Sequence, residues 1–98
     1  MSLEALVAAV KGRNIIAFEY DGKPRSVEPH AVGITPKGIA VMRAFQSGGD
    51  SATSVRSWKL FTVDKIVDLI TSDATFSEPR PGYVTGDRAM QSVLAELA

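Results

Sequence analysis

Two β-forming runs joined by a tight turn constrain the fold of this chain more than any other feature. The runs are residues 25–34 and 39–45, and the turn between them, residues 35–38, reads Thr-Pro-Lys-Gly. Proline pre-sets the first central position of such a turn and glycine relaxes its exit, so we expect an antiparallel hairpin. Pro29 interrupts the first run, and because proline donates no ladder hydrogen bond, we expect a bulge or an edge there.

Three more segments have the two-residue alternation or the β-rich composition of strands. They are residues 14–20, 57–63 and 66–70, and a turn at residues 21–24, Asp-Gly-Lys-Pro, connects the first of them to the hairpin. Five short strands joined mostly by tight turns predict a mainly β fold, a small closed or nearly closed five-stranded barrel. Closure is expected because it removes the exposed edges of an open sheet.

Amphipathic segments flank the predicted barrel. Residues 3–11 and residues 87–97 each place apolar side chains at helical spacing, and Asp87 is a suitable N-cap for the second segment. We therefore expect an N-terminal and a C-terminal amphipathic helix. Residues 72–84 contain two prolines and a glycine and predict an extended tail. Residues 1–98 are interpreted as a single domain, with barrel strands from about residue 14 to residue 70.

The composition excludes several kinds of site. The chain has 98 residues, no cysteine and one histidine, so thiol nucleophiles, Cys-ligated zinc and iron–sulfur clusters are ruled out. A single histidine with scattered carboxylates has no metal-ligand spacing, and we expect no metal and no cofactor. No apolar run approaches the roughly 18 residues of a spanning helix. We expect a soluble cytoplasmic protein with no membrane partner.

The formal charge of zero conceals an uneven distribution. Residues 25–61 hold five basic and two acidic groups, whereas residues 62–98 hold three basic and six acidic groups. One part of the surface is therefore expected to attract anions although the whole molecule does not. This pattern argues against bulk electrostatic binding of duplex DNA and allows a small anionic ligand or a short nucleic-acid segment.

Two segments resemble the WYL domain family. They are residues 19–29, EYDGKPRSVEP, and residues 56–66, RSWKLFTVDKI, and the resemblance covers about residues 15–70. It is closest to small stand-alone members, because we find no helix-turn-helix segment. At the position of the tripeptide that names the family the chain has residues 39–42, IAVM. The resemblance implies an Sm-like or SH3-like barrel that senses ligands, commonly nucleic acid or nucleotide, through a basic groove.

Candidate ligand-binding residues follow from the strand positions. Guanidinium groups on adjacent strands can grip phosphate oxygens bidentately, and an aromatic side chain beside them can stack on a base. Loop hydroxyls and amides suit a polar rim. The candidate ligand-binding residues are Arg25, His30, Arg43, Arg56, Trp58 and Lys59, and the candidate rim residues are Gln46, Ser51 and Ser54.

Each candidate also has a purely structural interpretation. The arginines can pair with nearby carboxylates such as Glu28, and exposed pairs of this kind contribute little. His30 can contact a phosphate, or it can anchor the bulge at Pro29 by a hydrogen bond. Trp58 can present a stacking surface, or it can close one end of the barrel. The loop residues can simply make the loop flexible.

Catalytic patterns are missing from the sequence. There is no Gly-x-Ser-x-Gly elbow, and residues 48–51, GGDS, lack the lysine of a phosphate-binding loop. We therefore expect no catalytic residues and no enzyme. The first hypothesis is a regulatory ligand-sensing module that binds a nucleotide or single-stranded nucleic acid. The second is a protein-interaction module that forms a homodimer or docks to a larger regulatory partner.

Overall fold

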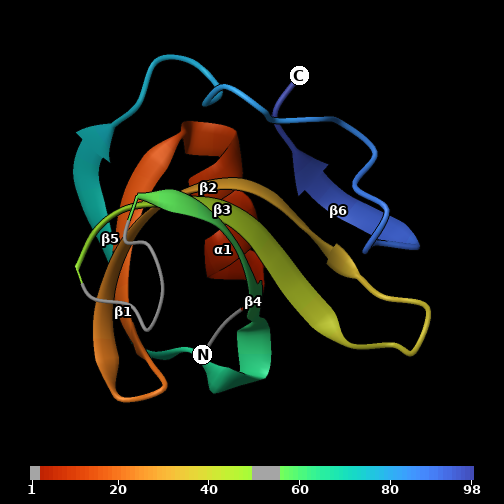
Figure 1. The fold of residues 1–98 in the computed structure, drawn as a ribbon, viewed down its shortest axis with the longest axis horizontal. Coiled ribbons are helices and arrows are strands. Elements are labelled where there is room, and N and C mark those ends of the chain that lie inside the picture. The colour runs from red at the N-terminus through yellow and green to blue at the C-terminus, as the bar shows by residue number, and fades with distance from the viewer. Residues whose placement is uncertain (1–2, 50–55) are drawn as a thin grey trace.

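The computed structural model of the protein describes residues 3–49 and 56–98, and within them it has one α-helix and six strands (Figure 1). The mainly β fold is as predicted, and so is the N-terminal helix. In chain order the elements are α1 (Leu3–Gly12), β1 (Asn14–Tyr20), β2 (Lys23–Ile34), β3 (Ala40–Gly49), β4 (Ser57–Thr62), the short 3-10 helix η1 (Val63–Lys65), β5 (Val67–Thr75) and β6 (Ser92–Glu96).

The strands form one antiparallel sheet in the order β4-β3-β2-β1-β5, and β6 is added to β2. The turn between β1 and β2 consists of Asp21 and Gly22, whose φ angles are 53° and 73°. Two successive positive φ angles characterise the type I′ turn, which matches the twist of the strands it joins. The predicted hairpin of β2 and β3 is confirmed, and Ile34 pairs with Ala40 beside its turn.

The bend in β2 at Pro29 is also confirmed. Pro29 pairs with Ala44 of β3 and Ala31 pairs with Arg43, so His30 is an extra residue in the ladder. Such a bulge bends the strand and increases its twist. On its other edge β2 pairs with β1 before the bulge and with β6 after it.

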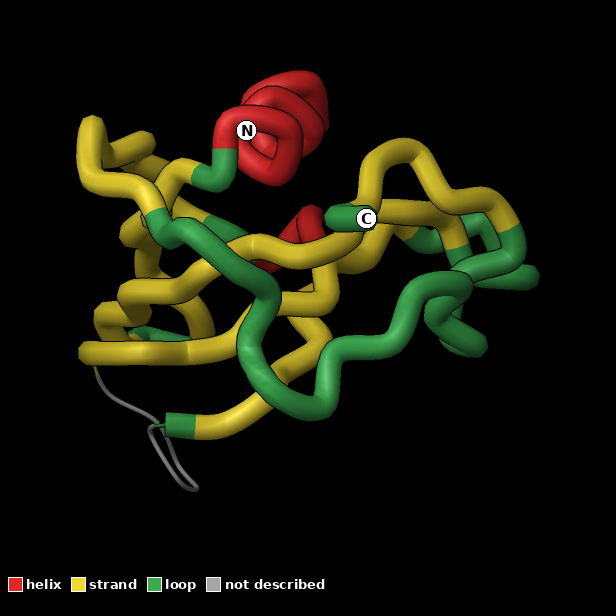
Figure 2. Tube along the Cα trace, turned by 90° about the horizontal axis from the view of Figure 1, so that it is seen from above, coloured by secondary structure: helices red, strands yellow, loops and turns green. Residues whose placement is uncertain are grey.

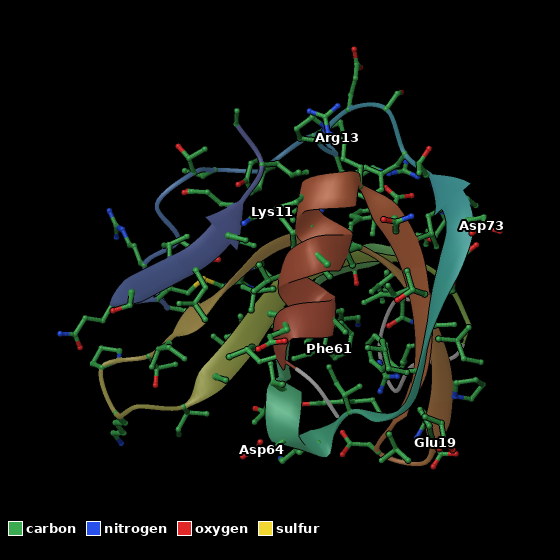
Figure 3. All side chains as sticks on the ribbon, turned by 180° about the vertical axis from the view of Figure 1, so that it is seen from behind. Lys11, Arg13, Glu19, Phe61, Asp64 and Asp73 are labelled. Carbon is green, nitrogen blue, oxygen red and sulfur yellow. The ribbon has the colours of Figure 1, made fainter. Side chains whose placement is uncertain are left out.

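The predicted closure of five strands into a barrel is not confirmed. The described strands form an open sheet of six, with β4 and β5 at the two ends of the main path. The helix covers the apolar side of the sheet, where Leu6 and Val10 of α1 belong to the same buried cluster as Met42 and Phe61. Figure 3 shows α1 lying across this side. Because the helix buries that surface, the core forms without closure of the sheet.

The C-terminal helix predicted over residues 87–97 is wrong. Only a turn forms at its start, where the carbonyl of Asp87 accepts a hydrogen bond from Met90 N–H, and the chain then enters β6. The apolar residues of this segment fit the helical repeat and also the two-residue repeat of a strand, because Ala95 and Leu97 are two residues apart and both are buried. The open edge of β2 beyond the bulge provides ladder hydrogen bonds, and this tertiary pairing overrides local helical preference.

A long connection links β5 to β6 without regular secondary structure. We call residues 76–91 the outer loop; the predicted extended tail overlaps it, although β5 continues to Thr75. In Figure 2 this loop runs below α1 from the strands on the left to those on the right.

Helix α1, with ten residues, has a length of about 15 Å. Among the described residues no helix is long and apolar enough to cross a bilayer.

Candidate functional site

The two faces of the sheet separate the predicted basic residues. Arg43 and Gln46 are three residues apart on β3, and side chains an odd number of residues apart point to opposite faces of a strand. Gln46 is fully buried on the face that packs against α1, which we call the inner face. Arg43 therefore lies on the opposite, outer face. The ligand site that was predicted to combine Arg25 and Arg43 is divided by this arrangement.

Arg25 lies on the inner face together with Gln46. Its Nη1 donates to Gln46 Oε1 at 3.0 Å, and its guanidinium carbon is 5.5 Å from the ring centroid of Tyr20 and 5.8 Å from that of Phe61. Only 7% of Arg25 is exposed, and its Nε has no hydrogen-bond partner within residues 3–49 and 56–98. Gln46 stands within the core and not at a rim. Lys59 is on the same inner face, because it pairs with the buried Ala44.

Ser51 and Ser54, the other two predicted rim residues, lie outside the described residues.

His30 is fully buried at the bulge of β2, between the sheet and the outer loop. Its Nε2 accepts a hydrogen bond from the backbone N–H of Arg80 at 3.0 Å, so the ring proton must be on Nδ1, which donates to the carbonyl of Glu28 at 2.7 Å. Burial lowers the pKa of His30, because the charged imidazolium loses hydration. This geometry matches the interpretation in which His30 anchors the bulge.

Aromatic rings enclose the His30 imidazole. Phe76 is stacked on it with ring centroids 5.2 Å apart, Trp58 meets it edge-on at 4.7 Å, and Tyr83 lies tilted at 5.1 Å. Trp58 also donates from Nε1 to the carbonyl of Pro81 at 3.1 Å. The bulge, β4 and the outer loop are therefore connected through one ring cluster.

A second connection is an ion pair between β2 and the outer loop that the sequence interpretation did not anticipate. Arg80 Nε and Nη2 each lie 2.8 Å from a different carboxylate oxygen of Glu28, a bidentate geometry. Glu28 was considered as a partner only for arginines of the predicted strands. Arg80 was missed because a pairing between residues 52 positions apart leaves no local pattern in the sequence.

Arg43 forms the third connection, again with the outer loop. Its Nε donates to Asp87 Oδ2 at 2.7 Å and its Nη2 to Asp87 Oδ1 at 3.3 Å. Oδ1 also accepts the N–H of Ala89. The hydrogen bond from Arg43 holds the pKa of the Asp87 carboxyl below its ordinary value. Asp87 was predicted to cap a helix, and it instead binds a neighbouring strand.

A pocket of about 530 Å³ lies between the outer face and the outer loop. Two of the predicted ligand residues, Arg43 and Trp58, line it from β3 and β4. The remaining lining comes from the outer loop. The lining residues are Arg43, Trp58, Gly82, Tyr83, Val84, Gly86, Asp87 and Arg88. A volume of several hundred Å³ is typical of small-molecule sites.

Beside the pocket, the guanidinium groups of two more arginines lie over the ring of Phe45. The guanidinium carbon of Arg80 lies 4.9 Å from the Phe45 ring centroid and that of Arg56 lies 5.9 Å from it. Phe45 in turn meets Trp58 edge-on at 5.6 Å. We call the following set the arginine–aromatic face: Arg43, Phe45, Arg56, Trp58, Arg80, Tyr83 and Arg88.

The charges on this face are partly balanced. Four arginines are accompanied by three carboxylates, because Glu28 binds Arg80, Asp87 binds Arg43 and Glu96 accepts the N–H of Gly86. In the part of the chain that the structure describes, Arg56 and Arg88 form no ion pair, and both are exposed. No three side chains of His, Cys, Asp or Glu gather into a metal site among these same described residues.

Comparisons of the chain with protein-family models, with curated proteins and with solved structures find no match. The resemblance to the WYL family therefore rests on residues 19–29 and 56–66 alone and stays a hypothesis.

Proposed function

We propose that this protein is a regulatory ligand-binding module that takes an anionic ligand, a nucleotide or a short single-stranded nucleic acid, on its arginine–aromatic face. The observation that carries the proposal is the pocket in which Trp58 lies beside Arg43 and Arg88. An aromatic ring next to guanidinium groups suits a ligand that has both a flat base and a phosphate. The resemblance to the WYL family supports the same class of ligand.

Arg88 is the group best suited to reach a phosphate first. It lines the pocket, it is exposed, and within the described ranges no carboxylate competes for it. Arg43 is already bound to Asp87, so a phosphate near it must share or displace that carboxylate. Arg88 therefore contributes more net attraction than Arg43, because no existing ion pair is lost when it binds.

Trp58 and Tyr83 provide the apolar part of the proposed site. Their rings are nearly parallel, with an interplanar angle of 24° and centroids 6.1 Å apart, and both line the pocket. Each ring is half-buried, so part of it remains available to solvent. Base stacking on aromatic side chains contributes about 1–3 kcal/mol per base with little dependence on sequence.

The test is binding of a fluorescein-labelled oligothymidylate and of ATP to the wild type and to Arg88→Ala. We expect Arg88→Ala to weaken binding by about tenfold, because a charge-assisted hydrogen bond contributes about 1.5 kcal/mol or more. Fluorescence anisotropy measures the affinity for the oligonucleotide, and competition by ATP measures the affinity for the nucleotide.

Lys65→Ala is the matched control. Lys65 is an exposed cation on η1 and lies outside the arginine–aromatic face, and its loss changes the net charge of the protein by the same amount. The control variant should bind like the wild type. Equal weakening by the two variants would indicate non-specific attraction, and no binding of either probe to the wild type would refute the proposal.

A further inference from the structure

The outer loop has no regular hydrogen-bonded ladder of its own, and His30 lies at its central attachment to the sheet. Arg80 makes two attachments, because its backbone N–H donates to His30 Nε2 and its guanidinium binds the Glu28 carboxylate. Beside it, the carbonyl of Pro81 accepts a hydrogen bond from Trp58 Nε1. Farther along, Asp87 binds Arg43. The loop is also held to β6 by the N–H of Gly86, which donates to Glu96, and to β2 by the N–H of Gln91, which donates to the carbonyl of Ile34. The three attachments made by residues 80 and 81 are the ones that lie beside the imidazole.

The hydrogen bond from the N–H of Arg80 to His30 can form only while the imidazole is neutral. Nε2 must present a lone pair to the N–H of Arg80, while Nδ1 uses its proton on the carbonyl of Glu28. A proton added to the ring goes to Nε2, since that nitrogen holds the free lone pair. Two N–H groups would then face each other at 3.0 Å, and the imidazolium would be fully buried. Both effects favour moving the loop away from the sheet.

The negative charge of Glu28 favours the protonated ring, but desolvation of the buried imidazole outweighs it and the carboxylate is shared with Arg80. From β2 the Glu28 carboxylate is already bound by Arg80, and from the outer loop the Arg80 guanidinium repels a second positive charge. The hydroxyl of Tyr83 donates to the carbonyl of Leu97, away from the ring. The other faces are covered by Trp58 and Phe76, which carry no charge.

From this geometry we infer that His30 is an acid-sensitive latch, whose protonation releases residues 80 and 81 of the outer loop from the sheet and loosens the pocket beside them. Six of the eight lining residues belong to that loop and follow directly after residues 80 and 81, so the shape of the pocket depends on how this segment is attached. The consequence for a ligand rests on the proposed function, whereas the opening of the loop does not. Neutral pH keeps the site assembled, and acid weakens ligand binding there.

The pH range follows from the direction of the pKa shift. In the opened loop His30 has the ordinary pKa of about 6.5, and in the closed loop burial lowers it. The closed state therefore has constant stability above about pH 6.5. Below that value the equilibrium constant for opening rises about tenfold per pH unit, until the lowered pKa of the closed state is reached.

The experiment is NMR on the ligand-free wild type between neutral and mildly acidic pH. The imidazole signals of His30 report its protonation, the only tryptophan reports its indole N–H bond to Pro81, and the amide of Arg80 reports exchange with solvent. We expect all three to change with one midpoint, and the opening constant of the Arg80 amide, obtained after correction for the intrinsic pH dependence of exchange, to rise about tenfold per pH unit. The amide shift of Met42 in the core should stay unchanged, because the fold remains intact.

The matched variant is His30→Gln, whose side-chain amide can accept from Arg80 and donate to Glu28 but does not titrate. It should keep the loop closed across the same pH range. If the variant does not fold, the wild-type titration decides alone. Protonation of His30 without loss of the Trp58 and Arg80 signals would overturn the inference, and so would a change of the Met42 amide shift at the same midpoint, which would mean that the whole protein unfolds. Failure to bind nucleotide would affect only the proposed function.

Discussion

Arg43 and Asp87 show how a single residue pair positions the pocket. The two residues are 44 positions apart, and their side chains are 30% and 12% exposed. Removing the carboxylate charge leaves Arg43 without its ion-pair partner and weakens the attachment of the outer loop. We expect Asp87→Asn to lower the free energy of unfolding by about 1–2 kcal/mol at neutral pH, as measured by urea denaturation.

The same pair has a predictable pH dependence. Because the folded state lowers the pKa of Asp87 below 3.8, its contribution to stability is fully present above that value and is lost as the pH falls through the folded pKa. The stability difference between the protein with Asp87 and the Asp87→Asn variant should therefore shrink as the pH falls below 3.8. The comparison is made in the His30→Gln background, because protonation of His30 would loosen the same loop before Asp87 titrates. A difference that is unchanged in acid would show that the charge of Asp87 is not what stabilises the loop.

At the residue scale, the sequence predicts which side chains carry charge or stack, and it cannot assign them to a face. Arg25 and Arg43 are on neighbouring strands, as predicted. Whether they share a face depends on the register of β2 and β3 and on bulges, which lie between Ser26 and Val27 and at His30. Each bulge shifts the alternation by one residue. Arg25 therefore lies in the core while Arg43 reaches the pocket.

Among the elements, β6 was the least predictable from the sequence. Residues 92–96 carry apolar side chains that fit a helix and a strand equally well, and the choice is made by the free edge of β2. The tight turn at Asp21 and Gly22, by contrast, was predictable, because its geometry depends on local backbone preferences alone. Local chemistry thus predicts turns and hairpins, while pairing between distant segments requires the tertiary structure.

Gly33 is the position at which the pairing of β2 and β6 can be tested. A Cβ added there would lie 2.7 Å from Met90 Sδ and would also collide with the carbonyl oxygen of Ser92. We expect Gly33→Ala to destabilise the protein by about 1–3 kcal/mol and to increase amide exchange in β6, measured by hydrogen–deuterium exchange.

Gly48→Ala is the internal control for that substitution. The added Cβ would meet only Ser26 Cβ, at an ordinary contact distance of 3.5 Å, and the residue has no positive φ. This variant should be as stable as the wild type or slightly more stable, because alanine restricts the unfolded chain. If both variants lose similar stability, the close packing of β6 on Gly33 is not the cause.

For the whole molecule, the zero formal charge and the arginine–aromatic face together determine how an anion would be attracted. Bulk attraction is absent because acidic and basic groups are equal in number. Local attraction then depends on the two arginines of the arginine–aromatic face that form no ion pair among the described residues, Arg56 and Arg88. The sequence indicated the positive excess of residues 25–61, but it did not indicate that Arg80 and Arg88, from the acidic half, lie on the same face.

Salt dependence measures how many arginines an oligonucleotide engages. Each phosphate contact with a single strand contributes about 0.7 to the slope of log affinity against log salt, so contacts with Arg56 and Arg88 predict a slope of about −1.4. Arg56→Ala and Arg88→Ala should each reduce this slope by about half, while Lys65→Ala leaves it unchanged. A much steeper slope would mean that Arg43 and Arg80 exchange their carboxylates for phosphates. A slope near zero would mean that the oligonucleotide is bound by the aromatic rings alone, which would contradict the electrostatic part of the proposed function.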